Sequence, residues 1–262
     1  MSEFAKKFPY TSPAEKRYAV SRDSVTQERI GFMRDLQKRL TEYFCIEIGI
    51  TLYGSITKGK DLSDSEVAAA SDIDCNVFFD GDYVSEHYSE LLEKFPGLKK
   101  YNQPNLNDSP ERQAFDKQDV FRYFIKHEIP GIIKLDGKMP TGLLEPEVIL
   151  TSTHRLENID FHLDQLQGGD GNYVTGITPD MPDIARLFQL DVGGIAPKYR
   201  TIFLEALAKR DEQTREKAWS LICSKIRSQE RYGWGTPGMK NLPETFAEAY
   251  AKYTKKDKDN NI

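Results

Sequence analysis

The sequence has only three cysteines in 262 residues, Cys45, Cys75 and Cys223, and they lie far apart. An odd and dispersed set argues against a disulfide framework and lacks the paired spacing of a zinc site. No apolar run approaches the roughly 20 residues that span a membrane. Residues 1–17 also lack the apolar segment of a secretory signal. These absences predict reduced thiols and a cytoplasmic protein without membrane contact.

Hydrophobic residues make up 39% of the chain and charged residues 29%, a balance typical of globular proteins. The length allows one large domain or two small ones. The net charge of −5 is unevenly distributed, because residues 181–262 carry 15 Lys and Arg against 11 Asp and Glu, whereas residues 1–180 carry 21 against 30. This asymmetry fits two lobes with different partners, or simply two solvated surfaces. The acidic balance makes extended nucleic-acid binding the less favoured interpretation.

Hydrophobic periodicity predicts that the first part of the chain mixes helices with strands. A Ser-Val-Thr-Gln capping box begins at Ser24, and apolar residues at helical spacing extend a predicted helix to Phe44. Apolar residues then alternate from Ile46 to Leu52, which predicts a half-buried strand. A second strand is predicted over Ile73–Phe79.

The middle of the chain is expected to be less regular. Ser85 can cap a helix over Glu86–Phe95, whereas residues 97–118 are polar, rich in Pro and Asn, and predicted as an inserted loop. The run Val120–Lys126 fits either a strand or a helix. Each of these expectations rests on local pattern alone.

The last third of the chain is predicted to be helical. Pro197 is typical of a helix start, and further helices are predicted over Gln213–Ile226 and Pro243–Tyr253. The expected fold class is therefore α/β, in the α+β sense of a mixed sheet with helices followed by a helical lobe. We expect an α/β domain over residues 1–175 and a helical C-terminal domain over residues 176–262, ending in a charged tail.

The residues that carry chemistry are a Gly-Ser pair and two aspartates. Gly54 and Ser55 end the first predicted strand, where backbone N–H groups and a hydroxyl could approach a phosphate. Asp72 and Asp74 are two residues apart on the second strand, so their carboxylates project from one face. Two adjacent carboxylates repel each other unless a cation lies between them, and Mg²⁺ prefers such hard oxygen ligands.

This order of motifs resembles the polymerase β-like nucleotidyltransferase superfamily, which includes the antibiotic adenylyltransferases. The resemblance covers Ile46–Phe79 well and the rest of the chain only in outline. It implies a site in which Asp72, Asp74 and a third carboxylate bind two Mg²⁺ ions. It also implies transfer of a nucleotide from a nucleoside triphosphate, with ATP expected, to a hydroxyl group with release of pyrophosphate.

The loop between the two motifs is longer than is usual in that superfamily. It contains Lys58, which could contact the nucleotide phosphates together with Gly54 and Ser55, although a solvated lysine is the commoner explanation.

The third carboxylate is predicted from a second alternating pattern. Val148–Ser152 and Asn158–Leu163 fit two strands of a hairpin, with Thr153–Glu157 as the connection. Asp160 lies on the polar face of the second strand, which makes it the preferred third ligand. Glu147, at the start of the first strand, is the alternative.

The acceptor remains open at this level. A hydroxylated small molecule is the leading hypothesis, because the length, net acidity and two-lobe plan suit a cationic acceptor. Transfer to an RNA end, or synthesis of a nucleotide second messenger, is the second hypothesis. A non-catalytic, nucleotide-binding regulatory protein of the same fold is the third.

Overall fold

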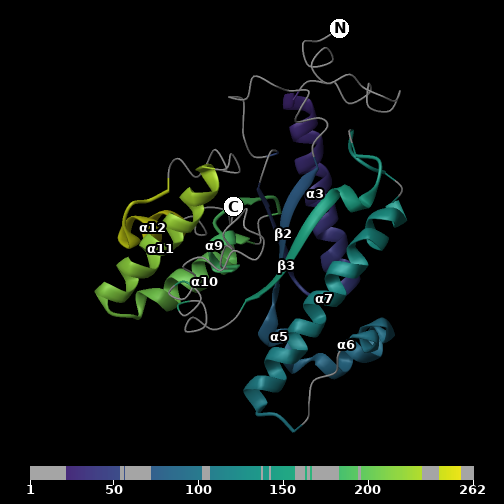
Figure 1. The fold of residues 1–262 in the computed structure, drawn as a ribbon, viewed down its shortest axis with the longest axis horizontal. Coiled ribbons are helices and arrows are strands. Elements are labelled where there is room, and N and C mark those ends of the chain that lie inside the picture. Colours follow the sequence, from purple (N-terminus) through teal and green to yellow (C-terminus); the bar gives the residue numbers. More distant parts are fainter. Residues whose placement is uncertain are drawn as a thin grey trace, which may run out of the picture.

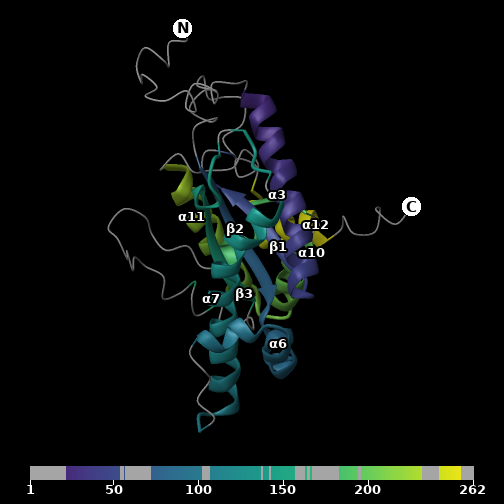
Figure 2. The same cartoon turned by 90° about the vertical axis from the view of Figure 1, so that its right-hand side faces the viewer.

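In the computed structural model, a four-stranded mixed sheet lies between long helices on one face and a group of helices from the C-terminal part on the other (Figure 1). The structure describes residues 22–53, 56, 72–101, 107–136, 138–141, 143–156, 163, 166, 183–193, 196–231 and 242–254. Figure 2 shows α3 (Arg22–Phe44) and α7 (Pro110–Asp136) running beside the sheet. The fold is thus mixed α and β, as the sequence predicts at this coarse level.

The sheet has the order β3-β2-β1-β4, with β2 (Ile73–Asp80) in an interior position. Strand β1 (Ile48–Tyr53) is antiparallel to β2, and β3 (Ile149–Leu156) is parallel to β2. The two strands predicted first along the chain are therefore confirmed. The short strand β4 (Leu190–Asp191) pairs antiparallel with β1 and was not predicted.

One face of the sheet packs on α3 and α7 and forms the cluster that we call the sheet core. Alternate residues of β1 and β2 contribute to it because side chains on a strand point to opposite faces in turn. Residues with no solvent exposure or almost none include Leu40, Ile50, Cys75 and Phe121. The alternating pattern correctly predicted the apolar residues of this face, but β1 is buried on both faces and not half-buried, because the other side of the sheet is covered as well.

The opposite face meets a second apolar cluster, the helical core. It contains side chains from α9 (Asp183–Arg186), α10 (Ala196–Ala208), α11 (Glu212–Arg231) and α12 (Phe246–Thr254). Phe78 of β2 is fully buried in this cluster, and so is Trp219 of α11. The three predicted C-terminal helices are confirmed as α10, α11 and α12. None of the described helices is long and apolar enough to cross a membrane.

Two predicted helix starts are wrong. Helix α3 begins at Arg22, so Ser24 lies within its first turn and is not the residue before the helix. The N–H groups of a first turn have no partners within the helix. The helix α5 (Gly81–Glu86) is capped by Asp80, whose carboxylate accepts from Tyr83 N at 3.1 Å. Ser85 lies inside α5 and donates to Gly81 O. Most of the predicted helix after Ser85 is instead α6 (Tyr88–Lys94).

The predicted inserted loop is shorter than expected. A 3-10 helix covers Pro96–Lys100, and α7 already begins at Pro110, with Ser109 accepting from the Arg112 backbone N–H at 3.2 Å. The ambiguous run Val120–Lys126 belongs to α7. Its buried members pack at helical spacing on the sheet core, so tertiary contacts decided what local pattern left open.

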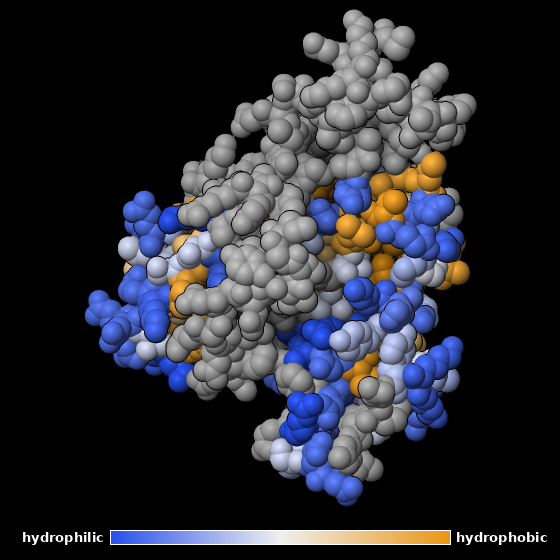
Figure 3. Space-filling model, viewed as in Figure 1, coloured by the Kyte–Doolittle hydropathy of each residue, from blue (hydrophilic) through white to orange (hydrophobic). Residues whose placement is uncertain are grey.

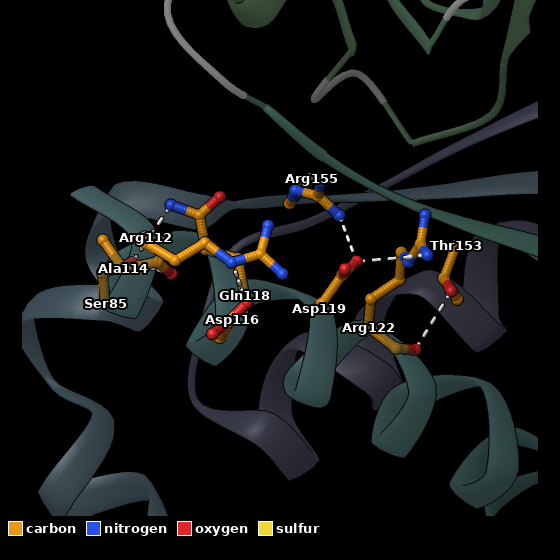
Figure 4. Close-up of polar contacts among 9 residues, drawn as sticks. All are labelled: Ser85, Arg112, Ala114, Asp116, Gln118, Asp119, Arg122, Thr153 and Arg155. Atoms are coloured by element: carbon orange, nitrogen blue, oxygen red, sulfur yellow. Dashed lines mark hydrogen bonds and ion pairs between the residues drawn. The ribbon is translucent and has the colours of Figure 1, made fainter. Parts of the chain in front are cut away.

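The predicted hairpin turn at Thr153 is also wrong, because β3 continues to Leu156. Figure 4 shows what holds this end of the strand against α7. The Thr153 hydroxyl donates to Arg122 O at 3.0 Å, and Arg155 forms an ion pair with Asp119. Both residues face α7, so the strand is anchored where the sequence favoured a turn.

Replacing Phe78 with alanine should lower the free energy of unfolding by about 3–5 kcal/mol, because it removes a fully buried ring where β2 meets the helical core. Urea denaturation followed by circular dichroism measures the change. Tyr123→Ala on α7 is the matched control, since Tyr123 is 50% exposed. Its loss should stay below about 0.5 kcal/mol. Equal losses in the two variants would contradict the role given to Phe78.

Candidate metal and nucleotide site

The two aspartates predicted as metal ligands lie at the beginning of β2. Asp74 is the second residue of the strand, and Asp72 immediately precedes it. In the sheet register, Asp74 lies between Tyr53 of β1 and Leu150 of β3. Because Ile73 is buried in the sheet core, strand alternation turns Asp74 towards the opposite face, which is also the face of the helical core.

The two carboxylates act on each other electrostatically. Burial, together with the negative charge of Asp72, raises the pKa of Asp74 to about 6. On the other side, burial lowers the pKa of Arg29 in α3 to about 10, while the charges of Asp72 and Glu28 oppose that shift. Burial and the neighbouring charge thus make the ionised form of Asp74 less favourable, a condition that a bound cation relieves.

The donors at this position fit Mg²⁺. Magnesium in proteins is commonly held by one or two carboxylates, with the remaining positions filled by water and substrate phosphates. Cys75, between the aspartates and Asn76, is not a candidate ligand, because it is buried in the sheet core and burial raises its thiol pKa. Within the described segments, no group of three or more His, Cys, Asp or Glu side chains converges on one point.

A buried polar cluster follows the aspartates on the same face. The Asn76 side chain is fully buried and donates to Thr51 Oγ1 at 3.3 Å and to Gln189 Oε1 at 2.5 Å. Its Oδ1 accepts from Arg186 Nη1 at 2.8 Å. This cluster joins β1 and β2 to the segment that leads into β4, so the C-terminal part of the chain is attached next to the two carboxylates.

Several of the predicted site residues lie outside the described residues. These are Gly54, Ser55 and Lys58 of the predicted phosphate loop, and Asp160, the preferred third ligand. Their roles stay predictions. The hairpin that was expected to bring Asp160 beside Asp74 is not present, because the strand beside Asp74 is β3. Leu156, at the end of β3, pairs with Asp80, which is six residues from Asp74.

The alternative third ligand, Glu147, is exposed and forms an ion pair with Lys134 of α7 at 3.1 Å. It belongs to the 3-10 helix Pro146–Val148 that leads into β3. Lys134 is on the helix that packs on the sheet core, so this contact directs Glu147 towards α7. The β3 residue paired with Asp74 is Leu150, an apolar side chain that is 49% exposed.

Sequence reasoning missed the Asn76 cluster. One signal was present, since Asn76 continues the period-two series of Asp72 and Asp74 on the same face of the strand. Nothing local indicated its partners, because Arg186 and Gln189 are more than 100 residues away along the chain. No family model, curated protein or solved structure matches this chain. The site must therefore be interpreted from its own residues.

Asp74→Asn should stabilise the protein at pH 8 and leave its stability unchanged at pH 4. The folded state holds the Asp74 proton up to a pKa of about 6, whereas the ordinary value is 3.8. Below pH 4, Asp74 is protonated in the folded protein and causes no penalty. As the pH rises through 6, Asp74 ionises in its partly buried position and lowers the free energy of unfolding, a cost that Asn does not incur. Given partial solvent exposure, we expect a gain of about 1–2 kcal/mol at pH 8.

Denaturation of both proteins at pH 4, 6 and 8 in the presence of a chelator measures this difference. Asp80→Asn is the control on the same strand, because Asp80 is exposed and Asn preserves its capping function. A gain for Asp74→Asn that is the same at all three pH values would show that the carboxylate charge is not its cause.

Proposed function

We propose that this chain is a metal-dependent nucleotidyltransferase that moves a nucleoside monophosphate, AMP from ATP in the first instance, to a hydroxyl group of a small molecule. The observation that carries the proposal is the pair Asp72 and Asp74. Burial, and in addition the charge of Asp72, raises the pKa of Asp74 at the beginning of an interior strand. Strain of this electrostatic kind is common at functional sites.

In the proposed reaction, the acceptor hydroxyl forms a bond to the α-phosphorus of the triphosphate, and the bond to the pyrophosphate oxygen breaks. Asp72 and Asp74 would hold the Mg²⁺ to which the reacting phosphate binds, and the hydroxyl proton would pass to a carboxylate of the site. Bound Mg²⁺ supplies charge neutralisation for the phosphates and acidifies the hydroxyl. The chain contributes mainly positioning and a fixed electrostatic environment.

The sheet geometry supports a site between two lobes. Asp74 lies on the face that Phe78 and the helical core occupy further along β2, so a substrate at Asp74 would have the C-terminal helices on one side. Beside Asp74, Tyr53 and Leu150 provide an aromatic and an aliphatic neighbour in the sheet register. Such a surface suits an organic acceptor or a nucleobase.

A non-catalytic nucleotide-binding protein is the second candidate. It is favoured by the described β3 strand, which carries Leu150 where a third carboxylate would be closest to Asp74. This alternative predicts nucleotide binding without turnover. Only a functional experiment separates it from the enzyme.

Incubation with each nucleoside triphosphate, Mg²⁺ and a library of hydroxylated acceptors should release pyrophosphate. Asp72→Asn and Asp74→Asn should each reduce the rate by roughly 100- to 1,000-fold, the scale for loss of a preorganised charge contact. Asp80→Asn should retain the wild-type rate, because it lies at the other end of the strand. Nucleotide binding without pyrophosphate release from any acceptor would favour the non-catalytic alternative.

The third carboxylate is tested by a pair of variants in the same assay. Asp160→Asn should abolish most activity if Asp160 completes the metal site, whereas Glu147→Gln should only break the exposed ion pair with Lys134. The Mg²⁺ dependence of the rate identifies a ligand, because loss of one raises the metal concentration needed. The opposite result in the two variants would assign the role to Glu147.

A further inference from the structure

Apolar side chains are exposed where α7 ends and the chain leads into β3. Leu135, the last residue but one of α7, is 81% exposed, and Leu144 is 62% exposed. Figure 3 shows hydrophobic residues gathered on this side of the molecule, where Figure 1 places the end of α7. Single exposed apolar residues are normal on a protein surface, but a group of them marks a site of interaction with another molecule.

A groove of about 490 Å³ opens at this place, between α7 and the segment that leads into β3. Its apolar lining consists of Ile133, Met139, Leu144 and Pro146. Ile133 and Pro146 are buried, so the groove is formed partly by residues that are fixed in the packing of the protein. Leu135 directly follows Lys134, which also lines the groove. An apolar projection therefore stands next to an apolar hollow.

The charges around the groove are divided between the two segments that form it. Lys134 belongs to α7, and Lys138 lies two residues beyond the end of that helix, whereas Glu145 and Glu147 belong to the segment that leads into β3. Lys134 and Glu147 form an ion pair at 3.1 Å, so the two segments already match each other in charge. Lys138 and Glu145 are exposed and extend the same division outwards. A two-fold rotation can place the positive side of such a surface against the negative side of an identical one.

We propose that this surface binds a second copy of the same chain, in a two-fold symmetric dimer in which Leu135 of each copy enters the groove of the other. Lys138 of each copy then faces Glu145 of its partner. A two-fold interface must be complementary to itself, and the projection beside the hollow and the divided charges both meet this requirement. A different protein would need only the groove. The inference does not depend on the proposed nucleotidyl transfer.

Sedimentation equilibrium of the full chain between about 1 and 100 µM measures the association, and the wild-type protein should dimerise with a Kd on the order of 10 µM or tighter. Leu135→Asp should weaken the dimer by roughly 100-fold or more, because it places a charge in an apolar contact. Ile202→Asp is the matched control, since Ile202 is 52% exposed on α10, a helix of the helical core. It should dimerise like the wild-type protein.

Charge reversal tests the two-fold arrangement itself. Lys138→Glu and Glu145→Lys should each weaken the dimer by roughly 10-fold, because each makes both symmetric contacts repulsive. An equal mixture of the two variants should recover association as a mixed dimer. In that dimer each Lys faces a Glu again, which a contact within one chain cannot produce.

Thermal unfolding checks that every variant is folded, and the melting temperatures should agree within about 2 °C because the substituted residues are exposed. If Leu135→Asp does not fold, the mixed charge variants decide the question. A wild-type chain that stays monomeric at the highest concentration overturns the inference and leaves the groove to a different protein. A dimer that Leu135→Asp and both charge reversals leave intact uses another surface, and this result overturns the inference as well.

Discussion

The structure depends on β2, an interior strand whose two faces lie in different surroundings. In β2, Ile73, Cys75 and Val77 are buried against α3 and α7, and the residues between them face the other side of the sheet. Because the side chains of a strand alternate strictly, its two faces can carry different kinds of residue while they share one backbone. Apolar burial on one face therefore fixes the position of Asp74 on the other, and this precision is what a metal and phosphate site requires.

The face of β2 opposite the sheet core changes along the strand. It begins with the carboxylate of Asp74, continues with the buried amide of Asn76, which accepts from the Arg186 guanidinium, and ends with Phe78 in the helical core. Apolar contact attaches the C-terminal helices, and the polar cluster around Asn76 lies between that contact and the carboxylates. Because buried polar groups are costly unless they are hydrogen-bonded, this cluster favours one arrangement of the sheet and the C-terminal helices.

The interpretation as a nucleotidyltransferase depends on charge rather than on overall similarity. Burial and the charge of Asp72 make ionised Asp74 unfavourable in the folded protein, and a bound cation would offset this cost. Arg29 and Arg186 place positive charge near the two ends of this carboxylate region, one from α3 and the other from the C-terminal part. The site is thus built from segments that are far apart in the sequence.

The sequence by itself determined the elements whose signal is local: the strands β1 and β2, the C-terminal helices, and the placement of both aspartates at the start of one strand. Apolar residues that recur every two positions in a strand, or every 3.6 in a helix, indicate burial on one side. This pattern is visible in the sequence whatever the packing partners are. Tertiary structure alone decided that β3 runs parallel to β2 through the expected turn, because Thr153 and Arg155 are held by α7. It also decided that Arg186 and Gln189 lie beside Asn76, since such contacts between distant residues leave no periodic trace in the chain.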